Sequence, residues 1–225
     1  MLGIAWCCAN ADITAKTKNQ FDLQPTMHPS VPLIDAQAIT KINGINAKLL
    51  RLAYKAYANA KAAGYGHKDI LTIVDYSLPS TTRRLWVIDM QTKQVIFHTH
   101  VAHGSGSGNN YATRFSNIHG SRMSSLGMFL TADVYNGNYG HSLNLIGLEK
   151  GFNSNALARR IVFHKAHYVD ESMINRIGRL GRSFGCLALN PKIAPKVINS
   201  IKNGSLVFCY YPDSKWLKES TLLNS

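Results

Sequence analysis

One histidine and one cysteine in the stretch 161–190 have the types and the setting needed for nucleophilic chemistry. A β-branched run ends in His164, and Cys186 follows further along, directly after Gly185. A thiol is a strong nucleophile only as the thiolate, so it needs a base or a cation nearby. A histidine at a strand end can take the thiol proton and later return it to a leaving amine. The stretch therefore predicts Cys186 as a nucleophile and His164 as its base.

The residues around this cysteine favour the same chemistry. Gly185 allows the backbone to approach closely, so that N–H groups beside Cys186 face a developing oxyanion. Arg179 and Arg182 add positive potential, which favours a thiolate and an anionic substrate. The residues alone also allow a plainer interpretation, in which Cys186 is a small buried hydrophobe and His164 a core histidine with satisfied hydrogen bonds.

The elements that must hold these residues are mostly strands. β-Branched and aromatic runs separated by turn residues predict strands at 70–76, 85–89, 95–102, 128–131, 143–148, 161–164 and 205–211. Apolar residues at three- and four-residue steps predict a helix within 35–63, which Asn43-Gly44 interrupts and Gly64 ends. Shorter helices are predicted at 172–180 and 191–203. The long Gly-, Ser- and Asn-rich loop at 103–126 is typical of a functional loop.

The chain of 225 residues is long enough for one good-sized core, and we divide it into five segments. Residues 1–11 end in Ala-Asn-Ala, which fits a signal-peptidase site and predicts the remnant of a signal peptide. An extended lead-in at 12–33 and a helical element at 34–66 precede the catalytic domain at 67–213 and a C-terminal tail at 214–225. We expect export to the periplasm or beyond, and no apolar run is long enough to span a bilayer.

Four cysteines are too few for a disulfide scaffold. Cys7 and Cys8 would leave with the signal peptide, so the mature chain would keep Cys186 and Cys209. We expect Cys209 to lie in the core, because a disulfide between the two would abolish the nucleophile.

The strongly basic composition, with a net charge of +13, predicts attraction to polyanions. No helix-turn-helix, zinc-finger or RNP signature is present, so we do not predict nucleic acid as the partner. An acidic wall polymer or a membrane surface suits the charge equally well.

The sequence does not favour a metal site or a pair of catalytic acids. His98, His100 and His103 have a spacing that permits zinc, with His119, His164 or Cys186 as a further ligand. The first two histidines fit packing or cross-strand positions equally well, and we predict no metal. No pair of carboxylates has the spacing of a glycosidase, and the glycines at 104–108 lack the strand–turn–helix context of a nucleotide loop.

The chain resembles the murein L,D-transpeptidase catalytic domain proteins of bacterial cell walls. Their signature is a strand-end histidine followed, after a short gap, by Ser/Thr-His-Gly-Cys. Here the corresponding residues read IVFH at 161–164 and SFGC at 183–186. Further stretches at 101–117, 124–131 and 139–156 resemble one subgroup, so the likeness runs from about residue 35 to 213.

The resemblance implies roles for single residues. Cys186 resembles the acyl-forming nucleophile, His164 its base, Ser183 the residue that shapes the cysteine loop and Gly185 a support of the oxyanion site. His167 is the reserve candidate for the base, because its distance from Ser183 along the chain fits the family spacing better.

A second group of residues resembles the family's substrate region. It comprises His103, Gly104, Tyr139, Gly140 and the loop 104–126, to which we add Arg182 for its charge.

The resemblance also implies a fold and a reaction. The fold is a mainly β, sandwich-like α+β domain with small capping helices. The cysteine attacks a peptidoglycan tetrapeptide stem, releases D-Ala and passes the acyl group to an amine of a neighbouring stem or an envelope protein. With water as acceptor the same site is an L,D-carboxypeptidase, and no cofactor is required.

Two departures from the family pattern keep a second function open. Phe184 replaces the usual histidine before Gly-Cys, and Lys165 replaces the usual glycine after the strand histidine. These changes allow a catalytically silent peptidoglycan-binding module on the same scaffold. A papain-like peptidase is disfavoured, because its nucleophile precedes its histidine in the chain.

Overall fold

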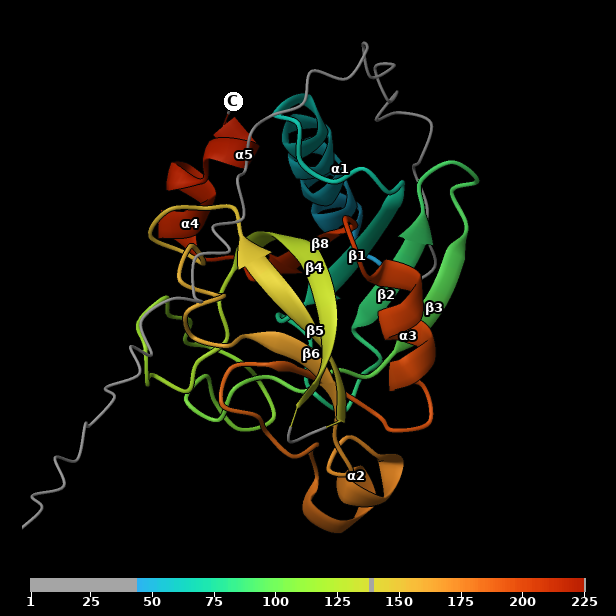
Figure 1. Cartoon of the computed structure of the whole chain (residues 1–225). Coiled ribbons are helices and arrows are strands. Elements are labelled where there is room, and N and C mark those ends of the chain that lie inside the picture. The colour runs from blue at the N-terminus through green and yellow to red at the C-terminus, as the bar shows by residue number, and fades with distance from the viewer. Residues whose placement is uncertain (1–43, 138–139, 225) are drawn as a thin grey trace, which may run out of the picture.

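A single curled sheet of eight strands organises the protein (Figure 1). The computed structural model describes residues 44–137 and 140–224. The strands are β1 Ile70–Asp75, β2 Leu85–Asp89, β3 Val95–Thr99, β4 Gly127–Gly137, β5 Gly140–Gly147, β6 Val162–Lys165, β7 Leu187–Leu189 and β8 Leu206–Tyr210. The helices are α1 Ala47–Ala62, α2 Glu171–Ile177, α3 Ala194–Ile201, α4 Ser214–Glu219 and α5 Thr221–Asn224. The mainly β fold predicted from the sequence is confirmed.

The order of strands brings the two sheet edges toward each other. The strands run β3-β2-β1-β8-β4-β5-β6-β7, with parallel pairing only for β1–β8 and β6–β7 among the described strands. The chain leaving β3 meets the opposite edge, where Ala102 N donates to Ala188 O of β7 at 3.0 Å. Gly104 then forms a bridge with Ser183, just before Cys186. The start of the long loop is thereby fixed against the cysteine loop.

Helix α1 covers one side of the sheet and begins at a well-formed cap. Asn46 Oδ1 accepts from Lys48 N at 2.8 Å, which satisfies one of the unpaired N–H groups of the first turn. Its apolar residues form one buried face, comprising Leu49, Leu50, Ala53, Tyr54, Ala56, Tyr57 and Ala60. The predicted helix within 35–63 is thus present from Ala47. The signal-peptide remnant at 1–11, the lead-in at 12–33 and residues 34–43 lie outside the described residues.

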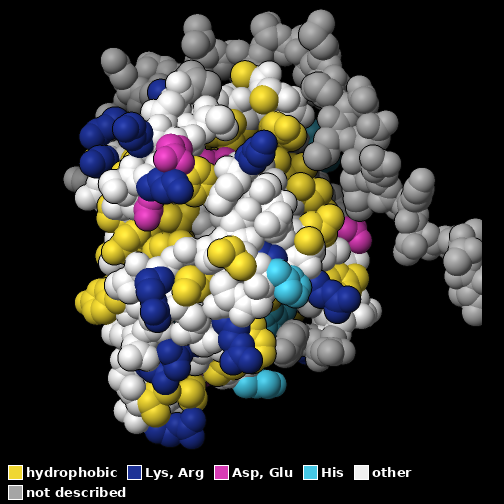
Figure 2. Space-filling model, turned by 90° about the vertical axis from the view of Figure 1, so that its left-hand side faces the viewer, with side chains coloured by type: hydrophobic (Ala, Val, Ile, Leu, Met, Phe, Trp, Pro, Cys, Tyr) yellow, Lys and Arg dark blue, Asp and Glu magenta, His cyan; other side chains and the backbone are white. Residues whose placement is uncertain are grey.

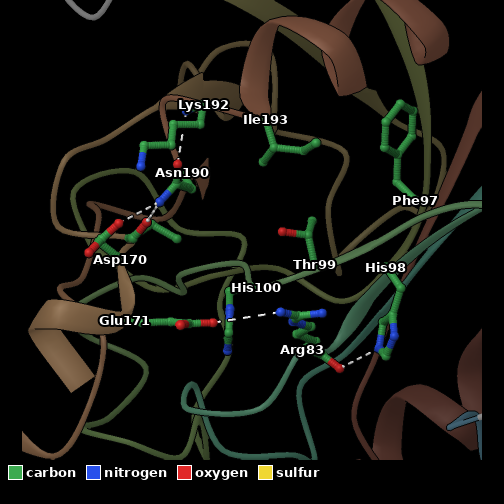
Figure 3. A pocket seen from close by; sticks show the side chains of 11 residues that line it. Arg83, Phe97, His98, Thr99, His100, Asp170, Glu171, Asn190, Lys192 and Ile193 are labelled. Atoms are coloured by element: carbon green, nitrogen blue, oxygen red, sulfur yellow. Dashed lines mark hydrogen bonds and ion pairs between the residues drawn. The ribbon is translucent and has the colours of Figure 1, made fainter. Parts of the chain in front are cut away.

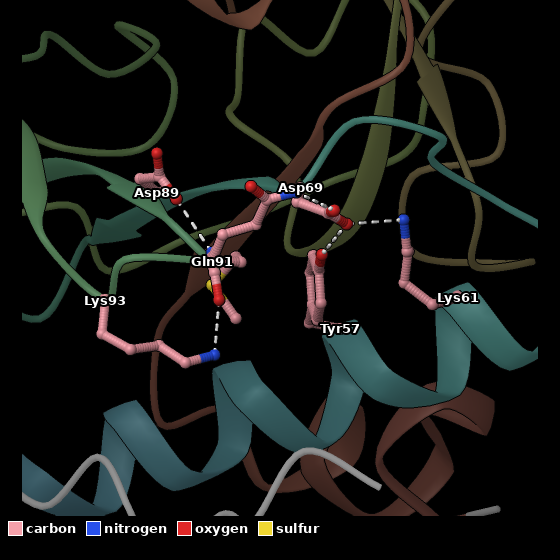
Figure 4. A network of polar contacts seen from close by, with 7 residues as sticks. Tyr57, Lys61, Asp69, Asp89, Gln91 and Lys93 are labelled. Carbon is pink, nitrogen blue, oxygen red and sulfur yellow. Dashed lines mark hydrogen bonds and ion pairs between the residues drawn. The ribbon is translucent and has the colours of Figure 1, made fainter. Parts of the chain in front are cut away.

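A polar network joins α1 to the sheet (Figure 4). The Asp69 carboxylate accepts from Tyr57 Oη at 3.2 Å, Lys61 Nζ at 3.0 Å and Gln91 Nε2 at 3.0 Å. The hydrogen bond from Gln91 is the largest cause that lowers the pKa of Asp69, followed by those involving Lys61. The charged carboxylate is therefore favoured in the folded chain.

We expect Asp69→Asn to lower the free energy of unfolding by about 0.5–1 kcal/mol at pH 7, because this side chain is 41% exposed and solvent screens it. The folded pKa lies below the unfolded one, so the stabilisation exists above the ordinary carboxylate pKa and is lost as pH falls through the folded pKa. Urea unfolding at pH 7 and near pH 3 measures both. A difference between variant and wild type that persists unchanged at the lower pH would contradict this account.

The C-terminal segment packs against the core. Within the predicted tail 214–225, residues 214–219 form α4 and residues 221–224 form α5. Trp216 is fully buried, and its Nε1 donates to Glu149 Oε2 at 3.0 Å. Each of these short helices buries only one or two side chains, and polar residues lie between them. The sequence therefore shows no apolar pattern that would predict this packing.

Candidate active site

Cys186 lies directly before β7, at the start of the parallel pair β6–β7. In that pair Phe163 aligns with Leu187 and His164 with Ala188. The half-buried Cys186 Sγ donates to Arg160 O at 3.4 Å, and the Val162 N–H also contributes a hydrogen bond to the thiol. The thiol is therefore held against the backbone at the beginning of β6.

His164 lies on the same strand, two residues beyond Val162, and so on the same face of the sheet. Its side chain is buried, and Nδ1 contacts Lys165 O at 2.9 Å. A carbonyl oxygen only accepts, so Nδ1 carries the proton and Nε2 is the basic nitrogen. This tautomer suits a histidine that must take a proton.

His167 is placed differently. It is exposed and follows Ala166, whose N–H donates to Leu189 O at the last residue of β7. Cys186 precedes the first residue of β7, so His167 lies toward the other end of that strand. The register therefore brings His164, and not His167, toward the cysteine.

The protonation of the pair differs from the thiolate expected from the sequence. Burial is the largest influence on Cys186 and raises the pKa of its thiol, although the Val162 N–H and the Arg159 charge lower it. Burial likewise lowers the pKa of His164 below its usual 6.5. Both shifts favour a neutral thiol and a neutral imidazole, because desolvation outweighs the nearby positive charge.

Ser183 and Gly185 fix the shape of the loop that carries Cys186. Ser183 Oγ donates to Cys186 O at 2.7 Å and accepts from Gly185 N at 3.1 Å. Gly185 has a φ of +121°, and a Cβ there would lie 2.8 Å from Met123 O. Only glycine fits this position without strain. The Gly185 N–H is used by Ser183, so in this conformation it does not point to an oxyanion.

Two of the expected substrate residues lie beneath the site instead of lining it. His103 is completely buried; its Nδ1 lies 2.7 Å from Arg84 Nη2 and its Nε2 lies 3.4 Å from Gly108 O. Burial lowers the pKa of His103 to about 4, which keeps the ring neutral. Gly104 is also buried, and a Cβ there would clash with Arg122 O at 2.4 Å. Both residues support the loop 104–126.

Arg182 and Gly140, two further expected substrate residues, contact the long loop and Lys165 respectively. Arg182 Nη1 donates to Gly108 O at 2.9 Å and to Asn109 Oδ1 at 3.0 Å, which ties the long loop to the cysteine loop. Gly140 begins β5 with a φ of +74°, and a Cβ there would lie 3.1 Å from Lys165 Cε. Tyr139 lies outside the described residues.

Arg84, which the sequence analysis did not single out, is buried beneath the start of the loop 104–126 and contacts His103. Its guanidinium is fully buried and donates to Val101 O through Nε at 3.2 Å and Nη2 at 3.0 Å, and to Leu78 O at 2.8 Å. Burial lowers the pKa of Arg84 to about 10, so the group stays charged at neutral pH. No periodic pattern identifies such a residue, because its partners are distant in sequence.

We expect Arg84→Met to lower the free energy of unfolding by about 3–5 kcal/mol, because it leaves buried carbonyls and His103 Nδ1 without a donor. Arg83→Met is the matched control. Arg83 is exposed and forms one surface ion pair, at 3.6 Å from Glu171, so its loss should cost about 0.5 kcal/mol or less. Denaturant titration compares the two variants, and equal losses would contradict the role assigned to Arg84.

Arg159 is the second functional candidate that the sequence analysis missed. Its Nη1 donates to Ser116 O and Ser125 Oγ, both at 2.5 Å, and its Nη2 donates to Met123 O at 2.6 Å. The half-buried guanidinium thereby fastens the long loop beside the cysteine loop, and its charge lowers the pKa of Cys186. The sequence signal was the pair Arg159-Arg160 immediately before the strand with the histidine.

A cavity of about 490 Å³ lies away from Cys186, where β3 faces the N-terminus of α2 and the start of α3 (Figure 3). Among its charged groups, Arg83 pairs with Glu171 at 3.6 Å, and the Asp170 carboxylate accepts a hydrogen bond from the Asn190 side-chain amide at 2.9 Å. His98 and His100 line it and contact the backbone oxygens of Arg83 and Thr81.

The three histidines considered for zinc do not converge, since His103 faces Arg84 in the interior. Within residues 44–137 and 140–224, no group of three His, Cys, Asp or Glu side chains has the geometry of a metal site. In the same part of the chain, no helix combines the length and apolar character of a membrane span.

Comparison with known proteins agrees with the sequence resemblance. A family model described as "L,D-transpeptidase catalytic domain" matches residues 41–210. No curated protein gives a match.

Similar solved structures include an L,D-transpeptidase from Mycobacterium smegmatis, at 13% identity and a TM-score of 0.40, covering 64% of this chain and 59% of that one. Another is the helical cell shape determining protein Pgp2 from Campylobacter jejuni, at 12% identity and a TM-score of 0.41, covering 72% and 56%. The chain thus spans less than two thirds of the length of these proteins.

Proposed function

Because the chain belongs to the L,D-transpeptidase catalytic domain family, we propose that it is a cysteine acyltransferase that acts on peptidoglycan tetrapeptide stems. Cys186 is the nucleophile and His164 the base. The donor is the peptide bond before the terminal D-residue, and the product of the first step is a thioester on Cys186. The acceptor is an amine of a second stem or of an envelope protein.

The proposed reaction balances with these two residues alone. As Cys186 Sγ attacks the carbonyl carbon, its proton moves to His164 Nε2. The imidazolium then gives this proton to the amine of the departing D-Ala, and the C–N bond breaks. An acceptor amine then attacks the thioester carbonyl and loses a proton to His164. As the C–S bond breaks, the imidazolium returns this proton to the sulfur, which restores the Cys186 thiol. Water in place of the amine gives the L,D-carboxypeptidase reaction.

The main support for this proposal is that the Cys186 thiol lies against the start of β6, the strand that carries His164. Sγ lies against the backbone of Arg160 and Val162, and His164 follows on the same face with Nδ1 bound to the Lys165 carbonyl. A fixed tautomer and a neutral ring are what a general base requires. The positive charge of Arg159 favours the thiolate that forms during attack.

The pH dependence of D-Ala release tests this pair. We expect kcat/KM on tetrapeptide muropeptides to fall only below pH 6.5, because burial lowers the pKa of His164 and the ring stays neutral down to that lower value. Alkylation of Cys186 by iodoacetamide should be slow at pH 7 and rise up to and beyond pH 9, because the pKa of the thiol is raised. An alkylation rate that is already constant at pH 7 would contradict the neutral pair.

A silent peptidoglycan-binding module is the second candidate. It is favoured by Phe184, which is 66% exposed at the position of the usual histidine, and by the raised pKa of Cys186. Mass spectrometry after incubation with a carbapenem separates the two functions. An acylating enzyme gains the mass of the antibiotic on Cys186, whereas a silent module binds stems and stays unmodified.

The proposed reaction requires contact with the wall. We therefore propose a periplasmic or secreted location in the bacterial envelope, with stem peptides as the principal partners and no cofactor. The net charge of +13 favours association with acidic wall polymers.

A further inference from the structure

A hollow of about 290 Å³ opens beside the cysteine loop and is lined by His119, Gly120, Arg122, Arg159 and Phe184. The first three come from the loop 104–126, Arg159 from the segment before β6, and Phe184 from the cysteine loop itself. Three separate parts of the chain therefore meet at this hollow. One of its lining residues, Phe184, is two residues before the proposed nucleophile Cys186.

The hollow has two cations and no acidic residue among its lining residues. Arg159 is half-buried, and its guanidinium donates to neutral oxygens of Ser116, Ser121, Ser125 and Met123. The ion pairs of the described residues join Lys61 to Asp69 and Arg83 to Glu171, so they leave both arginines without a carboxylate. Figure 2 shows Lys and Arg spread widely over one face of the molecule, with few Asp or Glu among them.

Arg122 is held in an unfavourable backbone conformation at the mouth of the hollow. Its backbone φ is +55°, a conformation that residues other than glycine rarely adopt. Its guanidinium lies over the ring of the exposed Phe184, 4.6 Å from the ring centroid. Backbone strain of this kind persists where the surrounding structure enforces it and is concentrated at functional sites. The contact keeps a cation at the mouth, above an apolar wall.

The hollow is close enough to the thiol to take part in substrate binding. Arg159 Nη2 lies 3.4 Å from the position of a Cβ on Gly185, the residue before Cys186. The last residue of a tetrapeptide carries its carboxylate about 3.5 Å beyond the bond that would be cleaved, since one residue spans no more than that. A thiol attacking that bond would leave the carboxylate within reach of a subsite beside the cysteine loop.

We propose that the hollow between Arg122, Arg159 and Phe184 is a carboxylate subsite that binds the terminal carboxylate of the leaving D-residue. The identity of this ligand rests on the proposed function, whereas the preference for a carboxylate follows from the lining itself. Arg122 binds the carboxylate at the mouth, Arg159 provides the inner positive charge, and Phe184 contacts the apolar part of the residue.

Two small alkylating reagents test the subsite without any assumption about the substrate. Iodoacetate carries a carboxylate and iodoacetamide does not, yet both react with the same thiolate. The ratio of their rates at Cys186, followed at pH 9 by peptide mass spectrometry on the full chain, is therefore independent of the thiol pKa. We expect Arg122→Ala to lower the iodoacetate-to-iodoacetamide ratio about fivefold, as the loss of one nearby charge in water implies.

Arg114→Ala is the matched control, since it removes the same charge from an exposed position of the same loop. Its ratio should equal that of the wild type. An unchanged ratio in Arg122→Ala, or an equal decrease in both variants, would overturn the subsite and leave only general surface charge.

A second measurement connects the subsite to turnover. Wild type should prefer a tetrapeptide with a free C-terminal carboxylate over its C-terminal amide, and Arg122→Ala should lose this preference through kcat/KM for the acid alone. An equal loss for acid and amide would overturn the subsite. If wild type releases no residue from either peptide, the proposed function fails, and the alkylation ratio still decides the subsite.

Discussion

Cys186→Ala is expected to abolish the release of D-Ala from tetrapeptide muropeptides, with a decrease of roughly 10⁴-fold or more. Alanine has no atom that can form the thioester, so the first step cannot occur. The substitution removes one half-buried sulfur, so the cysteine loop should keep its shape through the hydrogen bonds of Ser183. Quantifying free D-Ala by mass spectrometry measures the loss.

Cys209→Ala is the matched control for the other described cysteine. Cys209 is free and fully buried in β8, and burial strongly raises its pKa, so its thiol is unreactive. We expect this variant to retain activity and to lose about 1 kcal/mol of stability from the small cavity. Release that survives in Cys186→Ala, or that disappears in Cys209→Ala with the fold intact, would exclude Cys186 as the nucleophile.

The strands could be predicted from the sequence where apolar runs were long enough to show a pattern. β1, β2 and β8 lie within one residue of the predicted ranges, because each has five or six consecutive residues that are almost all buried. β7 was missed: its three residues are too few to display a period. β4 extends to Gly137, beyond the predicted end at residue 131, since the residues of its second half are exposed or only half-buried and include polar ones.

The contacts around the candidate site could not be predicted from the sequence. The buried contact between Arg84 and His103 joins residues 19 positions apart, and the contacts of Arg159 reach back 34 to 43 positions, so no local pattern indicates them. The nearby positive charges favoured a thiolate at Cys186, whereas burial raises the pKa of its thiol in the folded chain. Sequence reveals the nearby positive charges, but the degree of burial that opposes them depends on how the curled sheet closes around the thiol.

His164→Ala is expected to lower kcat for D-Ala release by about 10²–10⁴-fold, the usual contribution of a general base. The matched variant, His167→Ala, removes the same side chain from an exposed position and should remain close to wild type. Comparison of the two variants also decides between His164 and His167, the residue that the family spacing favoured as the base. Wild-type activity in His164→Ala together with a large loss in His167→Ala would reverse the assignment.

The pH dependence of the His164→Ala variant distinguishes a base from a structural residue. Without a base, attack requires a thiolate formed by solvent, and burial places the pKa of Cys186 above its ordinary value. The residual activity should therefore rise steeply with pH, and the difference from wild type should shrink toward pH 9 and above. If His164 only supported the fold of β6, the loss would be the same at every pH at which both proteins stay folded. A constant ratio of the two rates between pH 7 and pH 9.5 would thus exclude proton transfer through His164.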